Sequence, residues 1–273
     1  MELGFFQVDA FALAPLGGNP AGVVPLESWL PGELMLAVAA ENNLAETAFF
    51  VPDAGGPADF HLRWFTPTVE VDLCGHATLA TAFVLFELLG WRGDRIRFRG
   101  RSGPLAARRD GDLLELDFPA QPGAPCEGRA AVTAAIGVTP RELFLAEDLM
   151  AVLEDEAAVR AVRPDFGAVA ALPARGLIIT AAGDDPEVDF VSRFFAPAVG
   201  VPEDPATGSA HCTLTPYWAA RLGRDELRAV QLSARLGAMR CRYDRPAGRV
   251  AIAGRAFPYL TGRITIPDPS SYR

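Results

Sequence analysis

The sequence predicts an α+β protein of two pseudo-symmetric domains, each a curled, mostly antiparallel sheet around a central helix, with a cleft between them. The length of 273 residues suits two domains better than a single core. The 26 glycines and 23 prolines favour many turns and short strands. Two look-alike segments, 73–80 and 206–213, each place a glycine turn before small and apolar residues, which predicts one buried helix in each domain.

The first half of the chain alternates expected strands with two expected helices. A helix at 31–42 is indicated by Pro31 at its start and by Leu34 and Val38 on one side. A second helix at 75–89 carries almost no charge, which is typical of a helix that is buried all round. The expected strands cover 4–12, 21–26, 47–51, 59–65, 95–100, 104–109 and 112–118.

A proline-rich segment separates the two halves. Residues 118–125 hold three prolines, which continue neither a helix nor a sheet ladder. We therefore expect domains at 1–118 and 126–262, and a return of 263–273 to the first domain is compatible with this division. The second half repeats the order of the first, with helices expected at 129–136, 165–172 and 208–222, and strands at 143–146, 150–153, 177–181, 189–196 and within 228–266.

Composition and motifs exclude several function classes. The net charge is −9 and no basic cluster occurs, so we expect no nucleic-acid partner. All 25 basic residues are arginine, which removes the Schiff-base lysine of pyridoxal enzymes and the lysine of P-loop nucleotidases. A Rossmann fold is disfavoured because no Gly-x-Gly-x-x-Gly follows the first strand and strands and helices alternate poorly.

The cysteine pattern, the N-terminal residues and the length of the apolar runs indicate the cellular compartment. The four cysteines form no Cys-x-x-Cys pair and the three histidines lie far apart in the sequence, so we expect reduced thiols and no metal site. The chain opens on Gly4-Phe5-Phe6 without a signal-peptide pattern, and no apolar run reaches 18 residues. These features predict a cytoplasmic protein with no membrane partner.

Five motifs occur along the chain in a fixed order. They are Asn19-Pro20-Ala21-Gly22, Asn43-Leu44-Ala45-Glu46-Thr47, Phe65-Thr66-Pro67, Cys74-Gly75-His76-Ala77-Thr78 and Asp204-Pro205-Ala206-Thr207-Gly208-Ser209-Ala210. In these motifs the chain resembles the PhzF family, named for the phenazine-biosynthesis isomerase and related to diaminopimelate epimerase and proline racemase. The resemblance implies a diaminopimelate epimerase-like fold, proton transfer without a cofactor on a small-molecule carboxylate, and a homodimer.

Glu46 is the first candidate for the chemistry. It precedes an apolar strand, and a carboxylate in apolar surroundings has a raised pKa and can act as general acid and base near neutral pH. The resemblance assigns it the removal and return of a proton; the plain alternative is an exposed loop glutamate. His76, in the first turn of the buried helix, would hydrogen-bond the substrate or help the proton move, or else bond only to backbone.

Asp204 is the third catalytic candidate. Aspartate before proline is a common helix N-cap, and the resemblance places this residue in the active site. Backbone N–H groups at two glycine-started helices would hold a carboxylate and stabilise an enolate-like intermediate. The predicted substrate-binding residues are Asn19, Cys74, Gly75, Thr207, Gly208 and Ser209. We expect His211 to serve packing or capping, and His61 to be structural.

Two departures from related enzymes bear on the reaction. The epimerase and the racemase flank their substrates with two thiols, and here Cys74 matches one position while Thr207 occupies the other. A hydroxyl exchanges protons poorly at pH 7, so isomerisation by one carboxylate is favoured. Ala45 replaces a serine that many family members carry, which weakens the case for a phenazine precursor as substrate. An amino-acid epimerase or racemase using Cys74 and a non-catalytic small-molecule-binding dimer stay open as alternatives.

Overall fold

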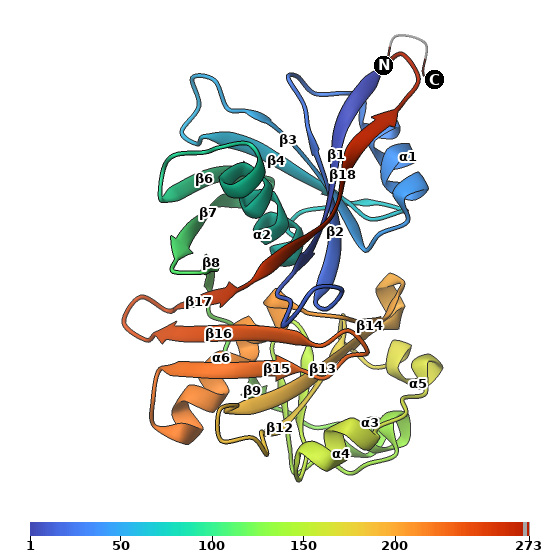
Figure 1. Cartoon of the computed structure of the whole chain (residues 1–273). Coiled ribbons are helices and arrows are strands. Elements are labelled where there is room, and N and C mark those ends of the chain that lie inside the picture. The colour runs from blue at the N-terminus through green and yellow to red at the C-terminus, as the bar shows by residue number, and fades with distance from the viewer. Residues whose placement is uncertain (270–271, 273) are drawn as a thin grey trace. The chain divides into compact units, whose positions relative to one another are not determined.

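The computed structural model describes residues 1–269 and 272, and the chain folds as two compact units (Figure 1). The first unit comprises residues 1–117 together with the chain from 253 onward, and the second unit comprises 118–252. The return to the first unit therefore starts earlier than the expected 263–273. The reason is that β18 (Ala256–Thr265) pairs antiparallel with all of β1 (Glu2–Ala10).

The strands of the first unit are hydrogen-bonded to one another in one continuous series. β1 pairs antiparallel with β2, β2 pairs parallel with β3, and β3 pairs antiparallel with β4. One edge of β4 then receives β5 antiparallel and β6 parallel, and β6, β7 and β8 follow as an antiparallel meander. The strands after β1 are β2 (Asn19–Pro25), β3 (Glu46–Pro52), β4 (Phe60–Phe65), β5 (Glu70–Val71), β6 (Arg95–Gly100), β7 (Gly103–Asp110) and β8 (Leu113–Pro119).

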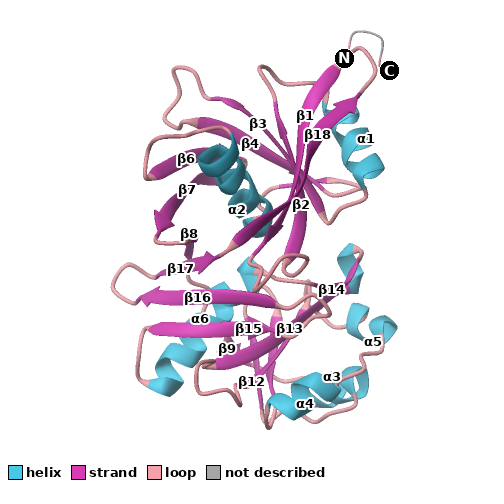
Figure 2. Ribbon diagram, viewed as in Figure 1, coloured by secondary structure: helices cyan, strands magenta, loops and turns pink. Residues whose placement is uncertain are grey.

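Two helices belong to the first unit. α1 (Gly32–Asn42) buries Leu34 and Met35 in a core that also contains Phe49 and Phe65. α2 (Gly75–Phe83) packs against β2 and β1, and its residues from His76 to Ala82 are buried, as expected for the central helix (Figure 2). The expected helix at 75–89 does not stay α-helical, because a π-helical turn, η1 (Val84–Leu88), follows α2.

The second unit repeats the strand order of the first. β11 pairs parallel with β12, β12 pairs antiparallel with β13, and one edge of β13 receives β14 antiparallel and β15 parallel. β9, β10 and β11 pair antiparallel in turn, as do β15 and β16. The strands are β9 (Ala124–Pro125), β10 (Glu142–Leu145), β11 (Leu149–Val152), β12 (Leu177–Ala182), β13 (Phe190–Ala196), β14 (Val201–Asp204), β15 (Glu226–Gln231), β16 (Gly237–Asp244) and β17 (Arg249–Gly254).

This repetition confirms the predicted pseudo-symmetry. The series β2, β3, β4, β5 and β6 has the same pairing directions as β11, β12, β13, β14 and β15. α2 connects β5 to β6, and α6 (Gly208–Leu222) connects β14 to β15 at the same point of the repeat. The predicted α+β class, with mostly antiparallel sheets and one central helix in each half, is therefore confirmed.

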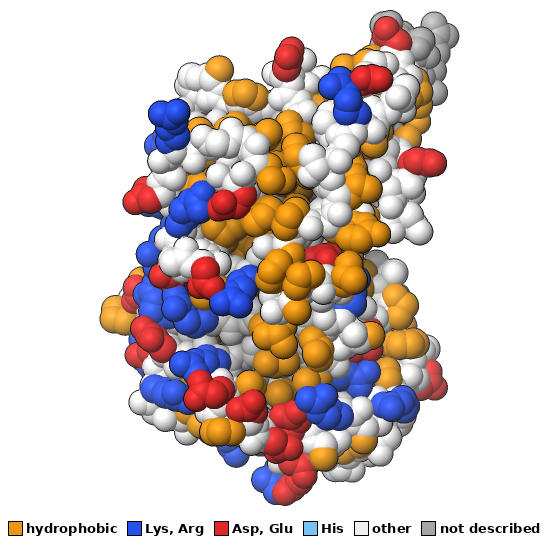
Figure 3. All heavy atoms as spheres, viewed as in Figure 1, with side chains coloured by type: hydrophobic (Ala, Val, Ile, Leu, Met, Phe, Trp, Pro, Cys, Tyr) orange, Lys and Arg blue, Asp and Glu red, His pale blue; other side chains and the backbone are white. Residues whose placement is uncertain are grey.

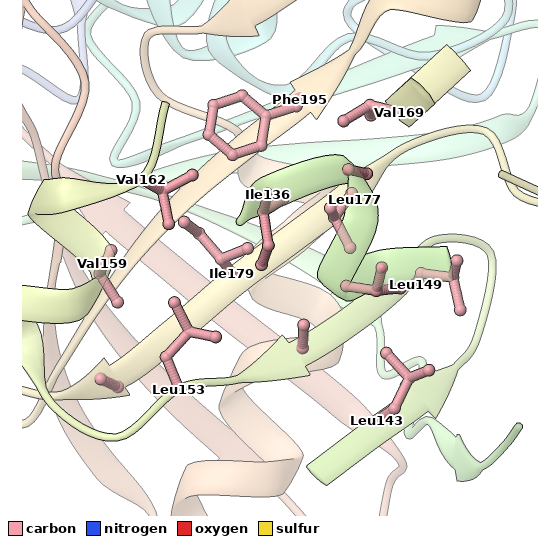
Figure 4. Packing of buried hydrophobic residues seen from close by; sticks show 14 of the residues in the cluster. Ile136, Leu143, Leu149, Leu153, Val159, Val162, Val169, Leu177, Ile179 and Phe195 are labelled. Carbon is pink, nitrogen blue, oxygen red and sulfur yellow. The ribbon is translucent and has the colours of Figure 1, made fainter. Parts of the chain in front are cut away.

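Smaller helices cover the core of the second unit. They are α3 (Arg129–Ile136), α4 (Glu156–Ala161), α5 (Phe166–Ala170) and the 3₁₀ turn η2 (Pro197–Val199). Figure 4 shows Ile136, Val159 and Val169 from these helices packed with Leu177 and Ile179 of β12. Burying such side chains contributes roughly 1.5–3 kcal/mol each. The helix α4 was not expected from the sequence.

The surface carries closely spaced charges of both signs. On the face shown in Figure 3, acidic and basic side chains lie beside one another. Exposed arginine–carboxylate pairs occur on the molecule, for example Arg97 with Asp59 and Arg228 with Glu187. Within residues 1–269, no helix is both long and apolar enough to cross a bilayer.

Candidate active site

Glu46 lies where the chain leaves α1 and enters β3. The helix ends at Asn42, and Asn43 adopts the left-handed conformation at φ +49°, which asparagine tolerates better than most residues. The chain then turns into β3, whose first residue is Glu46, and the parallel pairing with β2 sets Glu46 opposite Ala21. The motif at 43–47 therefore fixes the carboxylate at the beginning of a strand rather than on a loop.

Cys74 and His76 are placed by the start of α2. Cys74 is the N-cap residue, in an extended conformation at φ −144° and ψ 111°. Its carbonyl accepts hydrogen bonds from the backbone N–H of Thr78 at 3.1 Å and from the Thr78 hydroxyl at 2.6 Å. Gly75 and His76 are the first two helical residues, so their N–H groups belong to those that a helix leaves without an intrahelical acceptor.

Asn19 is brought to the same place by a tight turn before β2. Gly18 has φ +61°, and a Cβ there would lie 2.3 Å from the carbonyl oxygen of Ala10, so the turn requires glycine. Asn19 is fully buried, and its Nδ2 atom lies 3.2 Å from Nδ1 of His76. The amide nitrogen can donate to a neutral ring, and after a half-turn the amide oxygen can accept from an imidazolium.

The Glu46 cluster, as we call Asn19, Glu46, Cys74 and His76, is compact and nearly shielded from solvent. Oε2 of Glu46 lies 3.0 Å from Nε2 of His76, with side chains 17% and 7% exposed. Sγ of Cys74 lies 3.5 Å from Nδ1 and 3.9 Å from Nε2 of the same ring. The ring of His76 thus contacts a carboxylate, an amide and a thiol. Such an arrangement is suited to proton transfer.

The pKa of Glu46 differs from the sequence-based expectation. Burial alone would raise it, as predicted, but the charge of His76 and hydrogen bonds from His76 and Cys74 outweigh burial and lower the pKa below its usual value of 4.5. The expectation of a raised pKa is therefore wrong, because it considered burial without the partner. At neutral pH Glu46 is a carboxylate.

His76 and Cys74 complete the charge distribution. Burial would lower the pKa of His76, but the negative charge of Glu46 and the hydrogen bonds with Cys74 and Glu46 raise it well above 6.5. Burial also raises the pKa of Cys74 to about 11, so this sulfur is a thiol near neutral pH. Glu46 is therefore the anion that keeps His76 protonated, and the cluster holds a carboxylate, an imidazolium and a neutral thiol.

A second cluster forms around Asp204 in the second unit. Asp204 is the last residue of β14, and Thr207 rather than Asp204 is the N-cap residue of α6, so the N-cap hypothesis for Asp204 is wrong. The Thr207 hydroxyl donates to Oδ2 of Asp204 at 2.5 Å. The intervening segment is tightly packed, because a Cβ on Gly237 would lie 2.7 Å from Cβ of Ala206.

Gln231 holds this segment in place. Its side chain is fully buried; Oε1 accepts from the N–H of Thr207 at 2.9 Å, and Nε2 donates to the Asp204 carbonyl at 2.7 Å and to the Thr207 hydroxyl at 3.0 Å. An amide nitrogen only donates, so the Thr207 oxygen accepts from it and turns its own hydrogen to Asp204. The Thr207 N–H, expected to bind a carboxylate, is thus already used.

Ser209 follows at the second position of α6, after Gly208. Its hydroxyl oxygen accepts a hydrogen bond from Nη2 of Arg175 at 3.1 Å. Arg175 is held by the buried carboxylate of Asp148 through bonds of 3.0 Å and 2.6 Å. Because arginine can only donate, the Ser209 hydroxyl keeps its hydrogen for another acceptor.

The structure thus groups the predicted residues by unit. Asn19, Glu46, Cys74, Gly75 and His76 gather in the first unit, and Asp204, Thr207, Gly208 and Ser209 gather in the second.

Gln231 and Arg175 were missed by sequence reasoning. For Gln231 a signal existed, because it falls on the inward face of an alternating strand where Leu227 and Ala229 also point. Nothing in the sequence around Arg175 marks it.

The other two histidines have structural surroundings. His211 is fully buried, and its Nδ1 lies 2.8 Å from the Thr207 carbonyl. His61 accepts a hydrogen bond from the Trp29 ring nitrogen at 3.3 Å and packs edge to face against that ring.

Comparison with known proteins identifies the family. A family model described as phenazine biosynthesis-like protein matches residues 8–262. An uncharacterized isomerase of Pseudomonas aeruginosa is 50% identical over 264 residues, which cover 97% of this chain and 99% of the relative. A second uncharacterized isomerase of that organism is 52% identical over 267 residues, covering 97% of this chain and 100% of the relative.

A solved structure agrees with this assignment. The crystal structure of a phenazine biosynthesis protein of the PhzF family from Enterococcus faecalis superimposes with a TM-score of 0.92 at 44% identity, covering 97% of this chain and 100% of that chain. The resemblance seen in the five sequence motifs therefore extends over nearly the whole chain. The chain belongs to the phenazine biosynthesis-like, or PhzF, family.

Proposed function

We propose that this protein is a cofactor-independent isomerase of a small carboxylic acid, in which Glu46 carries a proton from one carbon to another. The observation that carries the proposal is the buried pair of Glu46 and His76, with 3.0 Å between Oε2 and Nε2. Membership of the family and the isomerase names of the two Pseudomonas relatives support the reaction class.

Each member of the pair has a distinct role in this proposal. The carbon–hydrogen bond of the substrate breaks, its electron pair passes into an adjacent unsaturated or carboxylate-bearing centre, and the proton forms a bond to the Glu46 carboxylate. Glu46 then gives the proton to a different carbon. His76 holds Oε2 by a charge-assisted hydrogen bond, so the carboxylate keeps one orientation through both steps.

The lowered pKa of Glu46 sets a condition on the substrate. A carboxylate with a pKa below 4.5 is a weak base, so the carbon acid must be activated by conjugation and its negative charge must be stabilised as it forms. The N–H groups of Gly75 and His76, which have no acceptor within the helix at the start of α2, are donors suited to that charge. Asp204 remains a proposed catalytic residue, and Asn19, Cys74, Thr207, Gly208 and Ser209 remain proposed substrate contacts.

The racemase alternative receives less support. It needs Cys74 as a thiolate base, and burial raises the pKa of this thiol to about 11. The neutral thiol of Cys74 instead donates toward Glu46 and helps to lower the pKa of that carboxylate. In the proposed reaction, Cys74 therefore tunes the base and does not replace it.

Deuterium exchange followed by proton NMR tests the proposal. The protein is incubated in deuterium oxide with dihydro-hydroxyanthranilate, diaminopimelate, proline, hydroxyproline and common L-amino acids. We expect deuterium to enter one conjugated carboxylic acid with the wild type and not with Glu46→Gln. The matched control is Glu115→Gln, which alters another buried carboxylate, bonded to Arg108, in the same unit. Equal exchange by wild type and Glu46→Gln would contradict the role of Glu46, and binding without exchange would favour a non-catalytic protein.

A further inference from the structure

The Glu46 cluster contains three chemically different metal ligands at one point. One ligand atom each from Glu46, Cys74 and His76 lies within 4.8 Å of the other two. The sequence spacing did not suggest a metal site, because Glu46 comes from the strand β3 and the other two residues from the start of α2. The fold, rather than a local motif, brings the three ligands together.

The ligand spacing suits a tetrahedral ion. Ligand atoms bound to zinc at about 2.0–2.3 Å lie about 3.3–3.7 Å from one another in a tetrahedron. In the cluster, Nε2 of His76 lies 3.0 Å from Oε2 of Glu46 and 3.9 Å from Sγ of Cys74. These two distances lie a few tenths of an ångström below and above the tetrahedral range, so small side-chain shifts would bring both ligand pairs to tetrahedral spacing.

The surroundings also meet the requirements of a metal-binding histidine. When Nε2 binds an ion, Nδ1 carries the ring proton and needs an acceptor, which fixes the orientation of the ring. The amide of Asn19 lies 3.2 Å from Nδ1, and its oxygen supplies that acceptor after a half-turn. Glu46, at 17% exposure, is the ligand that solvent reaches, and it gives an ion an entry path.

We propose that Glu46, Cys74 and His76 form a site for a thiophilic divalent cation such as Zn²⁺, which blocks the reaction reversibly by occupying the proton-transfer groups. Three protein ligands leave a fourth position for water or for a substrate carboxylate. The ion replaces the thiol proton of Cys74 and the Nε2 proton of His76, and both protons leave to solvent. The summed charge of the three side chains and the ion is then the same before and after binding, so the shielded site gains no unbalanced charge.

Optical titration with Co²⁺ tests the binding site directly. Co²⁺ takes the same ligands as zinc, and a cobalt–thiolate bond gives an intense near-ultraviolet absorption. We expect this absorption to saturate at one equivalent and to disappear when Zn²⁺ is added. Cys74→Ala and Cys74→Ser should both lose the absorption, while Cys212→Ala, which removes another buried thiol, should keep it. Glu46→Gln should weaken Co²⁺ binding by about tenfold or more.

Absence of the thiolate absorption in the wild type, or its persistence in both Cys74 variants, would overturn the inference. The inhibitory part of the inference rests on the proposed function, whereas the binding part does not. If Co²⁺ binds through Cys74 and no compound exchanges deuterium, the metal site stands and the proposed function fails. If exchange occurs and stoichiometric Zn²⁺ neither binds nor stops it, the proposed function stands and the metal site fails. A chelator should restore exchange in the zinc-treated protein.

Discussion

The imidazole of His76 lies 3.0 Å from the carboxylate of Glu46, and both side chains are largely buried. Burial disfavours an isolated charge, yet each residue supplies the opposite charge to the other, so both pKa values move toward the charged forms. The pair is therefore an ion pair over a broad range around neutral pH.

The activity should depend little on pH in the weakly acidic range. Glu46 must be ionised to take a proton, and its pKa lies below 4.5, whereas His76 stays protonated well above pH 6.5. We expect kcat/KM to be flat from pH 4.5 to 6.5, with a decline below that range as Glu46 is protonated and a decline at alkaline pH as His76 loses its proton. An acid limb that is centred above pH 4.5 in the wild type would contradict the ion pair.

Replacing His76 should move the acid limb upward. In His76→Gln the burial of Glu46 is no longer opposed by a positive charge, so its pKa should rise above 4.5 and the acid limb should follow. The measurement is the pH profile of kcat/KM for this variant and for His61→Gln. His61 lies in the same unit and contacts Trp29 instead of Glu46, so its replacement should leave the acid limb in place.

The ion pair should stabilise the fold within a defined pH window. Glu46 has a lowered folded pKa, so its contribution is present above pH 4.5 and is lost as the pH falls through the folded value. His76 has a raised folded pKa, so its contribution is present below pH 6.5 and is lost as the pH rises through the folded value. Both contributions are complete between pH 4.5 and 6.5.

Urea unfolding of wild type and Glu46→Gln measures this window. At pH 5.5 the variant should lose about 1.5–3 kcal/mol of unfolding free energy, the usual worth of a hydrogen bond to a charged group. The difference should shrink at strongly alkaline pH, where His76 is neutral in both proteins. A difference that stays constant from pH 5.5 to the alkaline limit would show that the charge of His76 is not involved.

Gln231 should be important for stability although it lies outside the predicted site. Gln231→Met removes the acceptor of the buried Thr207 N–H and a donor to the Asp204 carbonyl, and a buried donor left without its acceptor costs about 1–3 kcal/mol. Gln121→Met is the matched control, because that side chain makes one long bond to Glu147 at 3.3 Å, and its effect should stay within about 0.5 kcal/mol. Equal unfolding free energies for the two variants would refute this stabilising role of Gln231.

Much of the fold could be predicted because local patterns decide it. The glycine before each small-residue run marks the start of a central helix, and both α2 and α6 begin at the predicted glycine, at Gly75 and at Gly208. The partner of a strand is not a local property, however. The sequence predicts strands within 228–266 without showing that 256–265 pairs with β1, so the returning segment begins earlier in the structure than the sequence indicated.

The sequence predicted which residues form the site, but it did not predict their pKa values. The motifs named Glu46, Cys74 and His76, but the sequence does not give the 3.0 Å contact that reverses the pKa shift of Glu46. Asp204 illustrates the same limit, because a local rule for aspartate before proline suggested an N-cap. The pairing of β14 with β13 and the hydrogen bonds of Gln231 instead place Asp204 before the helix.

The central claim is that one carboxylate both removes and returns the proton, and a label-transfer experiment tests it most directly. Once exchange has identified the substrate, it is deuterated at the donor carbon and converted in ordinary water, and the product is examined by mass spectrometry at early conversion. Because the Glu46 side chain is only 17% exposed, we predict that part of the deuterium reaches the acceptor carbon of the product. If the product contains no deuterium at any extent of conversion, the account is contradicted. That result would indicate separate groups for proton removal and proton delivery.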